Sequence, residues 1–338
     1  MSEISHIKAC GDLDQDPSRQ WVVLITGGEI DTRANELLEK SSIRSIYADG
    51  YSGSEKLAEI AAKETVDAIL VRQGNIDANV INASSCLRVI AKHGSGVDNI
   101  DLAAASARNV PVLRALGANA QSVAELALTL SLSLMKDICI LNNTVKSGGW
   151  PKTGYVGRDL AGVRFGVIGF GEIGRRTAKL AQSIGMEAWA YDPYASDTDG
   201  ISVTRDLKEV LSQSDVVSLH CPLSSETHHL ISHERLSWMK STAFLVNTAR
   251  GAVVDEKALY EALTNGVIAG AALDSFEEEP PSKDHKFWML PNLLATPHVG
   301  GASRSALRNM ALQSAQNIID VLNGKAFDRR ALANQDVS

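Results

Sequence analysis

The order of apolar and polar residues divides most of the chain into short apolar runs that alternate with segments of helical periodicity. The runs have the length and the β-branched residues of buried parallel strands, whereas segments such as 56–63 repeat apolar residues at the spacing of one helix face. Strands that alternate with helices predict βα units on a parallel sheet. In the first part of the chain the predicted strands are 21–26, 43–46, 68–71, 88–91 and 110–113.

A second series of strands begins beside a glycine-rich turn near the middle of the chain, between long helical patterns at 120–146 and 303–322. We therefore expect an α/β fold with two doubly wound parallel-sheet domains. Residues 1–104 and 302–338 would form one domain and residues 105–301 the nucleotide-binding one, with disorder from about residue 331. The strands predicted for the second series are 165–168, 187–191, 216–220, 244–247, 269–272 and 293–295.

The glycine-rich turn lies between the strand 165–168 and a helix, and its spacing is that of a dinucleotide fingerprint. Gly169 would permit the tight turn, Gly171 would let the backbone approach a pyrophosphate, and Gly174 would let helix and strand pack closely. Taken alone, the pattern also fits a glycine-rich turn in an ordinary α/β domain.

Asp192 ends the next predicted strand, at about the 20-residue distance from the fingerprint that is typical of the ribose-binding carboxylate. A carboxylate there accepts hydrogen bonds from the ribose hydroxyls and repels a 2′-phosphate, and Pro193 and Tyr194 supply no cation to offset that repulsion. The sequence therefore favours NAD over NADP. A solvated Asp before a proline turn is the alternative.

Composition narrows the class of protein. The chain has 338 residues, 44% of them apolar and 22% charged, which suits a soluble globular protein of two domains. A formal charge of −7 gives no reason to expect a nucleic acid or membrane partner. The polar start predicts no export signal, and Cys10, Cys86, Cys139 and Cys221 have neither disulfide-framework nor zinc spacing. We expect a cytoplasmic protein without a metal.

Three ionisable residues follow three strands of the second series: Arg250, Glu279 and His298. The carboxyl ends of parallel strands meet at one edge, where α/β sheets bind ligands. Hydride transfer to a 2-keto acid needs a guanidinium to hold the carboxylate and a proton donor that titrates near neutrality. Glu279 beside the imidazole would stabilise its protonated form. Singly, each residue also fits an ordinary surface or turn position.

Together with these residues, the longer motifs resemble the D-isomer-specific 2-hydroxyacid dehydrogenases. This family contains phosphoglycerate dehydrogenase, hydroxypyruvate and glyoxylate reductases and D-lactate dehydrogenase. The resemblance extends from about residue 21 to residue 324. The matching segments are 93–101, 169–174, 220–223, 247–255, 271–281 and 296–301.

The resemblance implies roles for individual residues. Arg250 would bind the substrate carboxylate and carbonyl, His298 would be the acid/base, and Glu279 its partner. Asp274 would hold the nicotinamide carboxamide, and Thr248 and Cys221 would line the cofactor cleft. The full expected cofactor set is Gly169, Gly171, Glu172, Ile173, Gly174, Asp192, Cys221, Thr248, Asp274 and Gly300, and the substrate set is Arg72, Ser95, Gly96 and Arg250.

The resemblance also implies an architecture. A flavodoxin-like substrate domain would be split in sequence around a Rossmann NAD-binding domain and would close as a lid, which excludes water from the hydride path. The region 120–146 would supply much of a two-fold homodimer interface. An apolar Ala/Leu helix equally fits an ordinary core element.

Several small 2-hydroxy and 2-keto acids are candidate substrates. We rank 3-phosphoglycerate first, because Arg72 resembles the position that meets the substrate's distal group and Lys136 resembles a basic residue that a partner subunit uses for phosphate. Hydroxypyruvate or glyoxylate ranks second, and another small 2-keto acid third. Since the chain ends soon after Gly324, we expect no C-terminal regulatory domain.

Two other classes of protein share this scaffold and are alternatives to a 2-hydroxyacid dehydrogenase. Formate dehydrogenases have Gln where this chain has Glu279, which argues against them. The second alternative is an NAD-sensing, corepressor-like binding protein, a class that shares both the scaffold and the reactive residues. A measurement of turnover with a 2-keto acid distinguishes such a protein from an enzyme.

Overall fold

The computed structural model describes residues 19–50, 52–195, 198–334 and 337, so the polar start with Cys10 lies outside the described residues. The chain forms two compact units, 1–119 with 304–338 and 120–303. The first boundary falls after Asn119 rather than after residue 104, and the second after Ser303 rather than after residue 301. The first shift arises because residues 112–114 form a strand of the first sheet.

The first unit is built on a five-stranded sheet with the order β2-β1-β3-β4-β5, in which every pair is parallel. This is the flavodoxin-like order. Central strands such as β3 are buried along their whole length, as apolar runs of this kind require when both faces are covered. The strands are β1 Trp21–Thr26, β2 Ile43–Ala48, β3 Ala68–Val71, β4 Val89–Lys92 and β5 Val112–Arg114.

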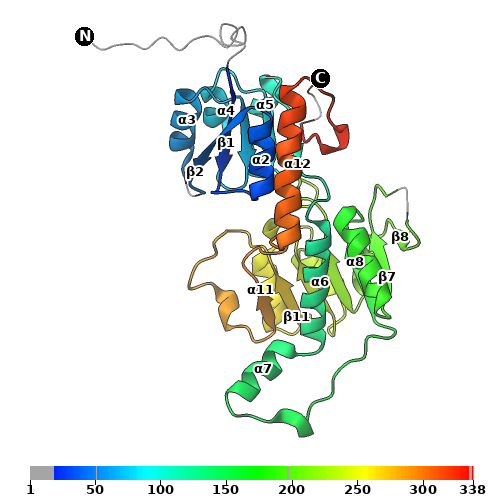
Figure 1. Ribbon diagram of the computed structural model, residues 1–338. Helices are drawn as coiled ribbons and strands as arrows, with labels where there is room; N and C mark the ends of the chain where they lie inside the picture. Colours follow the sequence, from blue (N-terminus) through cyan, green and yellow to red (C-terminus); the bar gives the residue numbers. More distant parts are fainter. Residues whose placement is uncertain (1–18, 51, 196–197, 335–336, 338) are drawn as a thin grey trace. The chain divides into compact units, whose positions relative to one another are not determined.

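Helices cover both faces of this sheet (Figure 1). Alternate residues of β1 face opposite ways, so that Val22 packs with α3, α4 and α5 and Val23 packs with α2 and α12. The helix α12 thus returns to the first sheet after the whole second unit. The helices are α2 Thr32–Lys40, α3 Ser54–Lys63, α4 Ala78–Ala83, α5 Leu102–Ala107 and α12 Arg304–Leu322.

The end of the chain is ordered further than we expected. Ala333 donates its N–H to the carbonyl of Val112 at 2.8 Å. The buried side chain of Asn334 accepts the N–H of Val112 in β5 and donates to the carbonyl of Val110, just before that strand. The prediction of disorder from residue 331 is therefore wrong for residues 331–334, because these residues pair with an edge strand. Residues 335, 336 and 338 lie outside the described residues.

The second unit contains a seven-stranded parallel sheet with the order β12-β11-β10-β9-β6-β7-β8. The strand order reverses at β6 and β9, which is the switch point where a Rossmann fold binds its nucleotide. The sequence did not predict β8, which is only three residues long. The strands are β6 Arg164–Ile168, β7 Glu187–Tyr191, β8 Ser202–Thr204, β9 Val216–Leu219, β10 Phe244–Asn247, β11 Gly270–Leu273 and β12 Leu293–Ala295.

Two layers of helices enclose this sheet as well. One core cluster joins α6 and α8 to the sheet, and the other joins α9, α10 and α11. In the described residues no helix is both long and apolar enough to cross a membrane. The helices are α6 Ala120–Met135, α7 Ile138–Lys146, α8 Glu172–Ser183, α9 Leu207–Gln213, α10 His233–Trp238 and α11 Glu256–Thr264; short 3-10 turns are η1 Pro151–Thr153, η2 Gly251–Val253, η3 Lys286–Met289 and η4 Arg329–Ala331.

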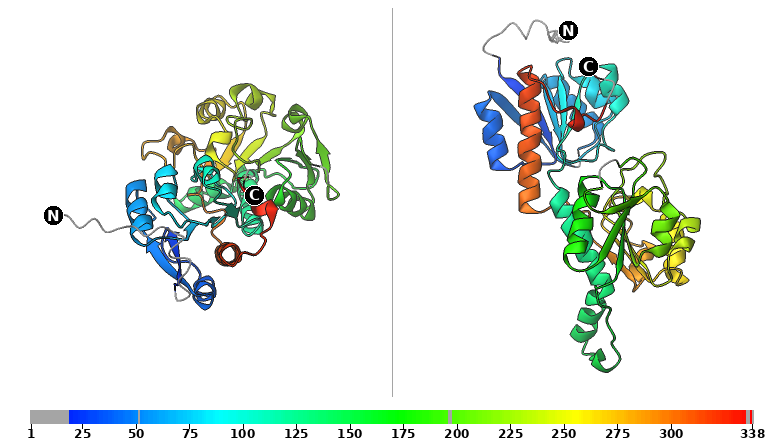
Figure 2. Two further views of the ribbon diagram at one scale, coloured as in Figure 1. Left: turned by 90° about the horizontal axis from the view of Figure 1, so that it is seen from above. Right: turned by 90° about the vertical axis from the view of Figure 1, so that its right-hand side faces the viewer.

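The single long helix predicted for 120–146 is wrong, because it breaks between Met135 and Ile138. Asp137 has a left-handed backbone with φ of +49°, which ends α6 and turns the chain into α7. No residue of α7 is buried. We call residues 137–158 the arm, since α7 and the segment after it extend away from the rest of the second unit (Figures 1 and 2).

Candidate active site

The glycine turn between β6 and α8 has the geometry that the fingerprint predicts. Gly169 has φ of +94°, and a Cβ there would lie 2.6 Å from the backbone nitrogen of Cys221. A Cβ on Gly174 would lie 2.0 Å from the carbonyl oxygen of Gly169, so only glycine permits this contact of helix and turn. Gly171 has open space around it, which leaves room for a ligand at the start of α8.

The start of α8 also lacks a capping side chain. Asp77, Asp206 and Asp255 cap α4, α9 and α11 by accepting hydrogen bonds from their first-turn amides. In contrast, the N-cap residue of α8 is Gly171, which has no side chain to cap the helix. Its first-turn N–H groups, at the positive end of the helix dipole, are therefore suited to bind a phosphate.

Asp192 stands at the carboxyl end of β7, beside this turn. Its Oδ2 accepts the N–H of Phe170 at 2.7 Å, and its Oδ1 accepts the N–H groups of Tyr194 and Ala195 at 2.8 and 3.0 Å. The carboxylate thus ties the fingerprint to the next strand. The sequence did not predict this second task of the residue expected to select NAD.

Three buried side-chain atoms after consecutive strands lack a hydrogen-bond partner: Nδ1 of His220 after β9, Oγ1 of Thr248 after β10 and Oγ of Ser275 after β11. Unpaired buried polar atoms are costly, so such a row indicates groups that a ligand completes. Together with the open glycine turn, these atoms fit a dinucleotide laid along the carboxyl edge. Of these three residues, the sequence analysis named only Thr248. The place of His220 at the end of the predicted strand 216–220 was an available signal, whereas Ser275 lies three residues after the predicted strand 269–272 and carried none.

Two titratable side chains that follow β9, His220 and Cys221, are neutral near pH 7. Burial lowers the pKa of His220 to about 3, so its imidazole is neutral near pH 7. Burial is also the main cause that raises the pKa of the Cys221 thiol to about 11. Cys221 therefore contributes a neutral thiol rather than a nucleophilic thiolate.

The expected catalytic pair is formed. Nδ1 of His298 lies 2.7 Å from Oε2 of Glu279, and both side chains are partly exposed. Since a carboxylate only accepts, Nδ1 carries the proton and Nε2 is left for the substrate. Burial raises the pKa of Glu279, but the hydrogen bond and charge of His298, the N–H of Phe276 and the charge of Arg250 together hold this pKa below its usual range.

The turn that carries Arg250 is shaped by the buried Asn247. The side chain of Asn247 donates to the carbonyl of Arg250 at 2.8 Å and accepts the N–H of Ala249 at 3.0 Å. One guanidinium nitrogen, Nη1, donates to the carbonyl of Ala249 at 2.8 Å. This turn brings the positive charge of Arg250 close enough to Glu279 to favour its ionised form.

Asp274 holds the loop of His298 in place. Its carboxylate is buried and accepts hydrogen bonds from Oγ1 of Thr296 at 2.6 Å, from the N–H of Val299 at 2.9 Å and from the N–H of Gly300 at 2.8 Å. His298 itself has φ of +53°, an uncommon conformation for its residue type. Asp274 therefore fixes the chain on both sides of His298, a task that the sequence did not predict.

The expected substrate residues of the first unit lie at the carboxyl edge of its own sheet. Nη1 of Arg72, after β3, donates to the carbonyls of Gly27 and Glu29 at 2.7 and 2.6 Å. His93, after β4, precedes the loop with Ser95 and Gly96. Burial, followed by the charges of Arg72 and Lys92, lowers the pKa of His93 to about 4.

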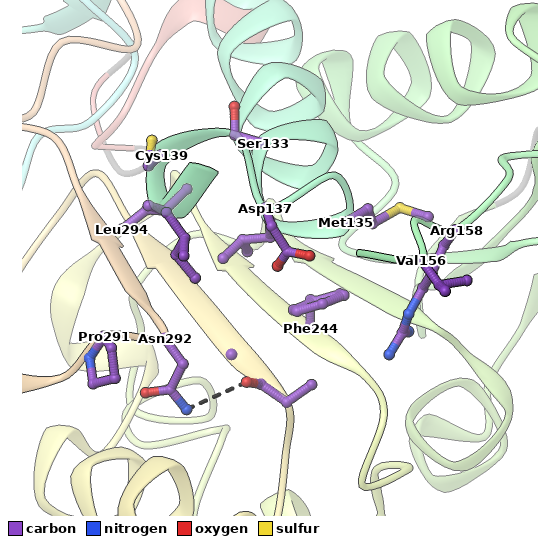
Figure 3. A pocket seen from close by; sticks show the side chains of 14 residues that line it. Ser133, Met135, Asp137, Cys139, Val156, Arg158, Phe244, Pro291, Asn292 and Leu294 are labelled. Atoms are coloured by element: carbon purple, nitrogen blue, oxygen red, sulfur yellow. Dashed lines mark hydrogen bonds between the residues drawn. The ribbon is translucent and has the colours of Figure 1, made fainter. Parts of the chain in front are cut away.

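A cavity of about 340 Å³ lies elsewhere in the second unit (Figure 3). Phe244 and Gly270 line it from the starts of β10 and β11, Leu294 lines it from the middle of β12, and Asp137 and Arg158 line it from the base of the arm. Arg250, Glu279 and His298 come after the carboxyl ends of these three strands. This cavity is therefore distinct from the site of Arg250, Glu279 and His298.

The carboxyl edge of the second sheet thus carries two features: a turn that is suited to a dinucleotide, and the imidazole–carboxylate pair of His298 and Glu279. This combination is typical of nucleotide-dependent oxidoreductases. Residues 128–300 match the family model described as D-isomer specific 2-hydroxyacid dehydrogenase, NAD binding domain. The chain belongs to the D-isomer specific 2-hydroxyacid dehydrogenase family and is an NAD-dependent oxidoreductase that acts on CH–OH donors. The family, fold class and cofactor predicted from the sequence are thereby confirmed.

Three similar proteins illustrate the range of this family. A hydroxypyruvate reductase of Thermotoga maritima is 37% identical over 87% of this chain and 96% of its own length. A D-3-phosphoglycerate dehydrogenase of Methanocaldococcus jannaschii is 39% identical over 82% of this chain, but this chain spans only 53% of that relative. The crystal structure of a glyoxylate reductase from Paecilomyes thermophila has a TM-score of 0.82 at 27% identity, covering 93% of this chain and 98% of that one.

Proposed function

We propose that this D-2-hydroxyacid dehydrogenase oxidises 3-phosphoglycerate reversibly with NAD. The observation that carries the choice of substrate is the positive charge at the carboxyl edge of the first sheet. There Arg72 and Lys92 both act on His93 and help to hold its pKa near 4. Such an edge favours a substrate with a second anionic group.

The proton chemistry belongs to His298. NAD, when bound, supplies the hydride acceptor for C2 of the hydroxy acid. Nε2 of the neutral imidazole takes the hydroxyl proton, and the ionised Glu279 on Nδ1 stabilises the imidazolium that forms. In the reverse direction the imidazolium returns the proton to the carbonyl oxygen of the 2-keto acid.

Arg250 holds the substrate by its carboxylate, because a guanidinium can pair with both oxygens and polarise the adjacent carbonyl. We propose that Ser95 and Gly96 add backbone amides to this carboxylate and that Arg72 meets the distal group. For the cofactor we propose the turn from Gly169 to Gly174, including Glu172 and Ile173, and the polar row at Thr248, Asp274 and Gly300. Asp192 and Cys221 complete the set.

Hydroxypyruvate or glyoxylate is the second candidate, and two contacts favour it. Nη1 of Arg72 already donates to two backbone carbonyls. The ammonium of Lys136 donates to the carbonyl of Arg158 within its own chain. Both cations are therefore less available for a phosphate than the sequence suggested, and a substrate with an uncharged distal group needs neither.

The test is NADH consumption against phosphohydroxypyruvate, hydroxypyruvate, glyoxylate, pyruvate and 2-ketoglutarate, each repeated with NADPH. The highest kcat/KM should belong to phosphohydroxypyruvate with NADH. Arg72→Met should then lower kcat/KM for the phosphorylated acid far more than for hydroxypyruvate. A preference for hydroxypyruvate that Arg72→Met leaves intact would establish the second candidate. Binding of NADH without turnover of any acid would instead support an NAD-sensing binding protein.

We also propose that the enzyme is a homodimer joined through the arm. Exposed large apolar side chains gather there, including Ile138, Ile140, Trp150, Tyr155 and Val156. Trp150 is 76% exposed and Val156 90% exposed. An arm that carries this much apolar surface needs a cover, and a second copy of the chain supplies one. We also propose a reducing cytoplasm as its location, which agrees with the free thiols of Cys139 and Cys221 in the described part of the chain.

A further inference from the structure

A second polar cluster lies beside the loop that carries Glu279. Oε1 of Glu277 accepts hydrogen bonds from Nε2 of His229 at 2.9 Å and from the N–H of Glu256 at 3.2 Å. In return, the N–H of Glu277 donates to Oε1 of Glu256 at 2.8 Å. The loop is thus bonded reciprocally to the first residue of α11 and, through the imidazole, to the segment before α10.

The cluster extends to a second histidine. Nε2 of His285 lies 3.3 Å from Oε2 of Glu256, while Nδ1 of His285 accepts the N–H of Phe287. The ring of His285 also contacts the ring of Phe276, with centroids 6.5 Å apart. Polar and aromatic contacts therefore converge on the two residues Phe276 and Glu277.

The peptide between Phe276 and Glu277 is the point where the loop touches the turn of Arg250. A Cβ on Gly251 would lie 1.8 Å from the carbonyl carbon of Phe276 and 2.3 Å from the nitrogen of Glu277. The backbone next to Arg250 is therefore in direct contact with this peptide. Only glycine at position 251 permits so close an approach.

The same segment holds the carboxylate of Glu279. The N–H of Phe276 donates to Oε1 of Glu279 at 3.0 Å, and Oε2 of Glu279 bonds His298. A displacement of the Phe276–Glu277 peptide would move Glu279 relative to both Arg250 and His298. The loop around Glu277 to Glu279 is otherwise exposed, so few apolar contacts oppose such a displacement.

We propose that Glu277, with His229 and Glu256, is a positioning residue for the dehydrogenase reaction. By fixing the Phe276–Glu277 peptide against Gly251, it sets the place of the Glu279 carboxylate between Arg250 and His298. This inference rests on the role of Glu279 in the proposed function. In this proposal Glu277 acts through Glu279 and not on the substrate itself.

The test uses Glu277→Ala, with Glu278→Ala as the matched control. Both changes remove one carboxylate from the same exposed loop, but only Glu277 carries the contacts described above. With the acid that the wild type reduces best, Glu277→Ala should lower kcat about tenfold or more, the size expected from a misplaced catalytic group. The dissociation constant for NADH should stay unchanged, and Glu278→Ala should match the wild type.

A double-mutant cycle separates positioning from general loss of structure. If Glu277 acts through Glu279, Glu277→Ala should cost far less kcat in a Glu279→Gln background than in the wild type. The pH profile of kcat in Glu277→Ala should also shift toward that of Glu279→Gln. Equal losses in both backgrounds, or equal activity of Glu277→Ala and Glu278→Ala, would overturn the proposal.

Two further measurements keep the outcome clear. His229→Gln retains a donor that can reach Glu277 and should keep most of the activity, whereas His229→Ala should resemble Glu277→Ala.

The proton NMR signal of the His298 ring reports the contact of this ring with Glu279 and does not require turnover. At a fixed pH, the chemical shift of this signal should change in Glu277→Ala and not in Glu278→Ala. If the wild type reduces no acid, the proposed function fails, while this signal still decides the positioning role.

Discussion

His298 combines the side chain that we propose as acid and base with an uncommon backbone conformation. Its φ of +53° places the ring where Nδ1 meets Glu279, and Asp274 fixes the neighbouring residues by three hydrogen bonds. The sequence identified the histidine, the glutamate and the arginine by their places after strands. It could not show that Asp274 and Gly251 help to hold them in position, because these contacts join loops that are far apart in the chain. The contacts of Asn247 with Arg250 and Ala249 are local, but they depend on a turn conformation that the sequence pattern does not reveal.

Replacement of His298 tests its role as acid and base. Asn is the suitable substitute, since it tolerates a left-handed backbone better than Ala and cannot transfer the proton. His298→Asn should lower kcat by about 10²- to 10⁴-fold, the usual contribution of general acid–base catalysis. NADH affinity and the unfolding midpoint should change little, as fluorescence titration and thermal denaturation would show. Full activity of His298→Asn would remove the residue from the proton transfer.

The lowered pKa of Glu279 makes a prediction about stability at acid pH. A carboxyl whose pKa is lower in the folded state stabilises the fold above its unfolded-state pKa, about 4.3, and this contribution is lost as pH falls through the folded value. The wild type should therefore exceed Glu279→Gln in free energy of unfolding at about pH 5, and the difference should shrink toward about pH 3. Urea denaturation at several pH values measures it. A difference that grows on acidification would contradict the assignment.

At the scale of elements, the pattern of apolar runs identified strands and helices well. It missed β8, whose three residues carry no detectable period. It also joined α6 and α7 into one helix, because Lys136 and Asp137 do not interrupt a helical pattern in sequence. The break depends on the left-handed backbone of Asp137, which only the structure reveals.

The turn from β6 to α8 yields a prediction with an internal control. Gly171→Ala meets no atom within 4 Å and should leave the unfolding midpoint near the wild-type value, yet its methyl group would occupy the space expected for the pyrophosphate. NADH affinity should then fall in this variant. Gly174→Ala should lower both NADH affinity and the midpoint, since its Cβ would lie 2.0 Å from the carbonyl oxygen of Gly169. Wild-type affinity in Gly171→Ala would place the phosphates elsewhere.

At the scale of the whole molecule, the arm carries a prediction about assembly. The double change Trp150→Ser and Val156→Ser removes two highly exposed apolar side chains and should convert the proposed dimer into a monomer. Sedimentation velocity measures the change. Met289→Ser is the control, because Met289 is 85% exposed but lies on η3 outside the arm. A dimer that survives the double change, or a monomeric wild type, would refute the proposed interface.

Local information in the sequence determined the two parallel sheets and the glycine turn, and it identified the trio that we propose as catalytic. Apolar periods, glycines and ionisable residues at strand ends are properties of neighbouring residues, so they can be read along the chain. The tertiary structure decided which residues that are distant in sequence contact one another. Asp192 bonds Phe170, the segment 331–334 pairs with β5, and Glu277 joins the Glu279 loop to α11. Such contacts depend on the packing of whole elements, and no short stretch of sequence encodes them.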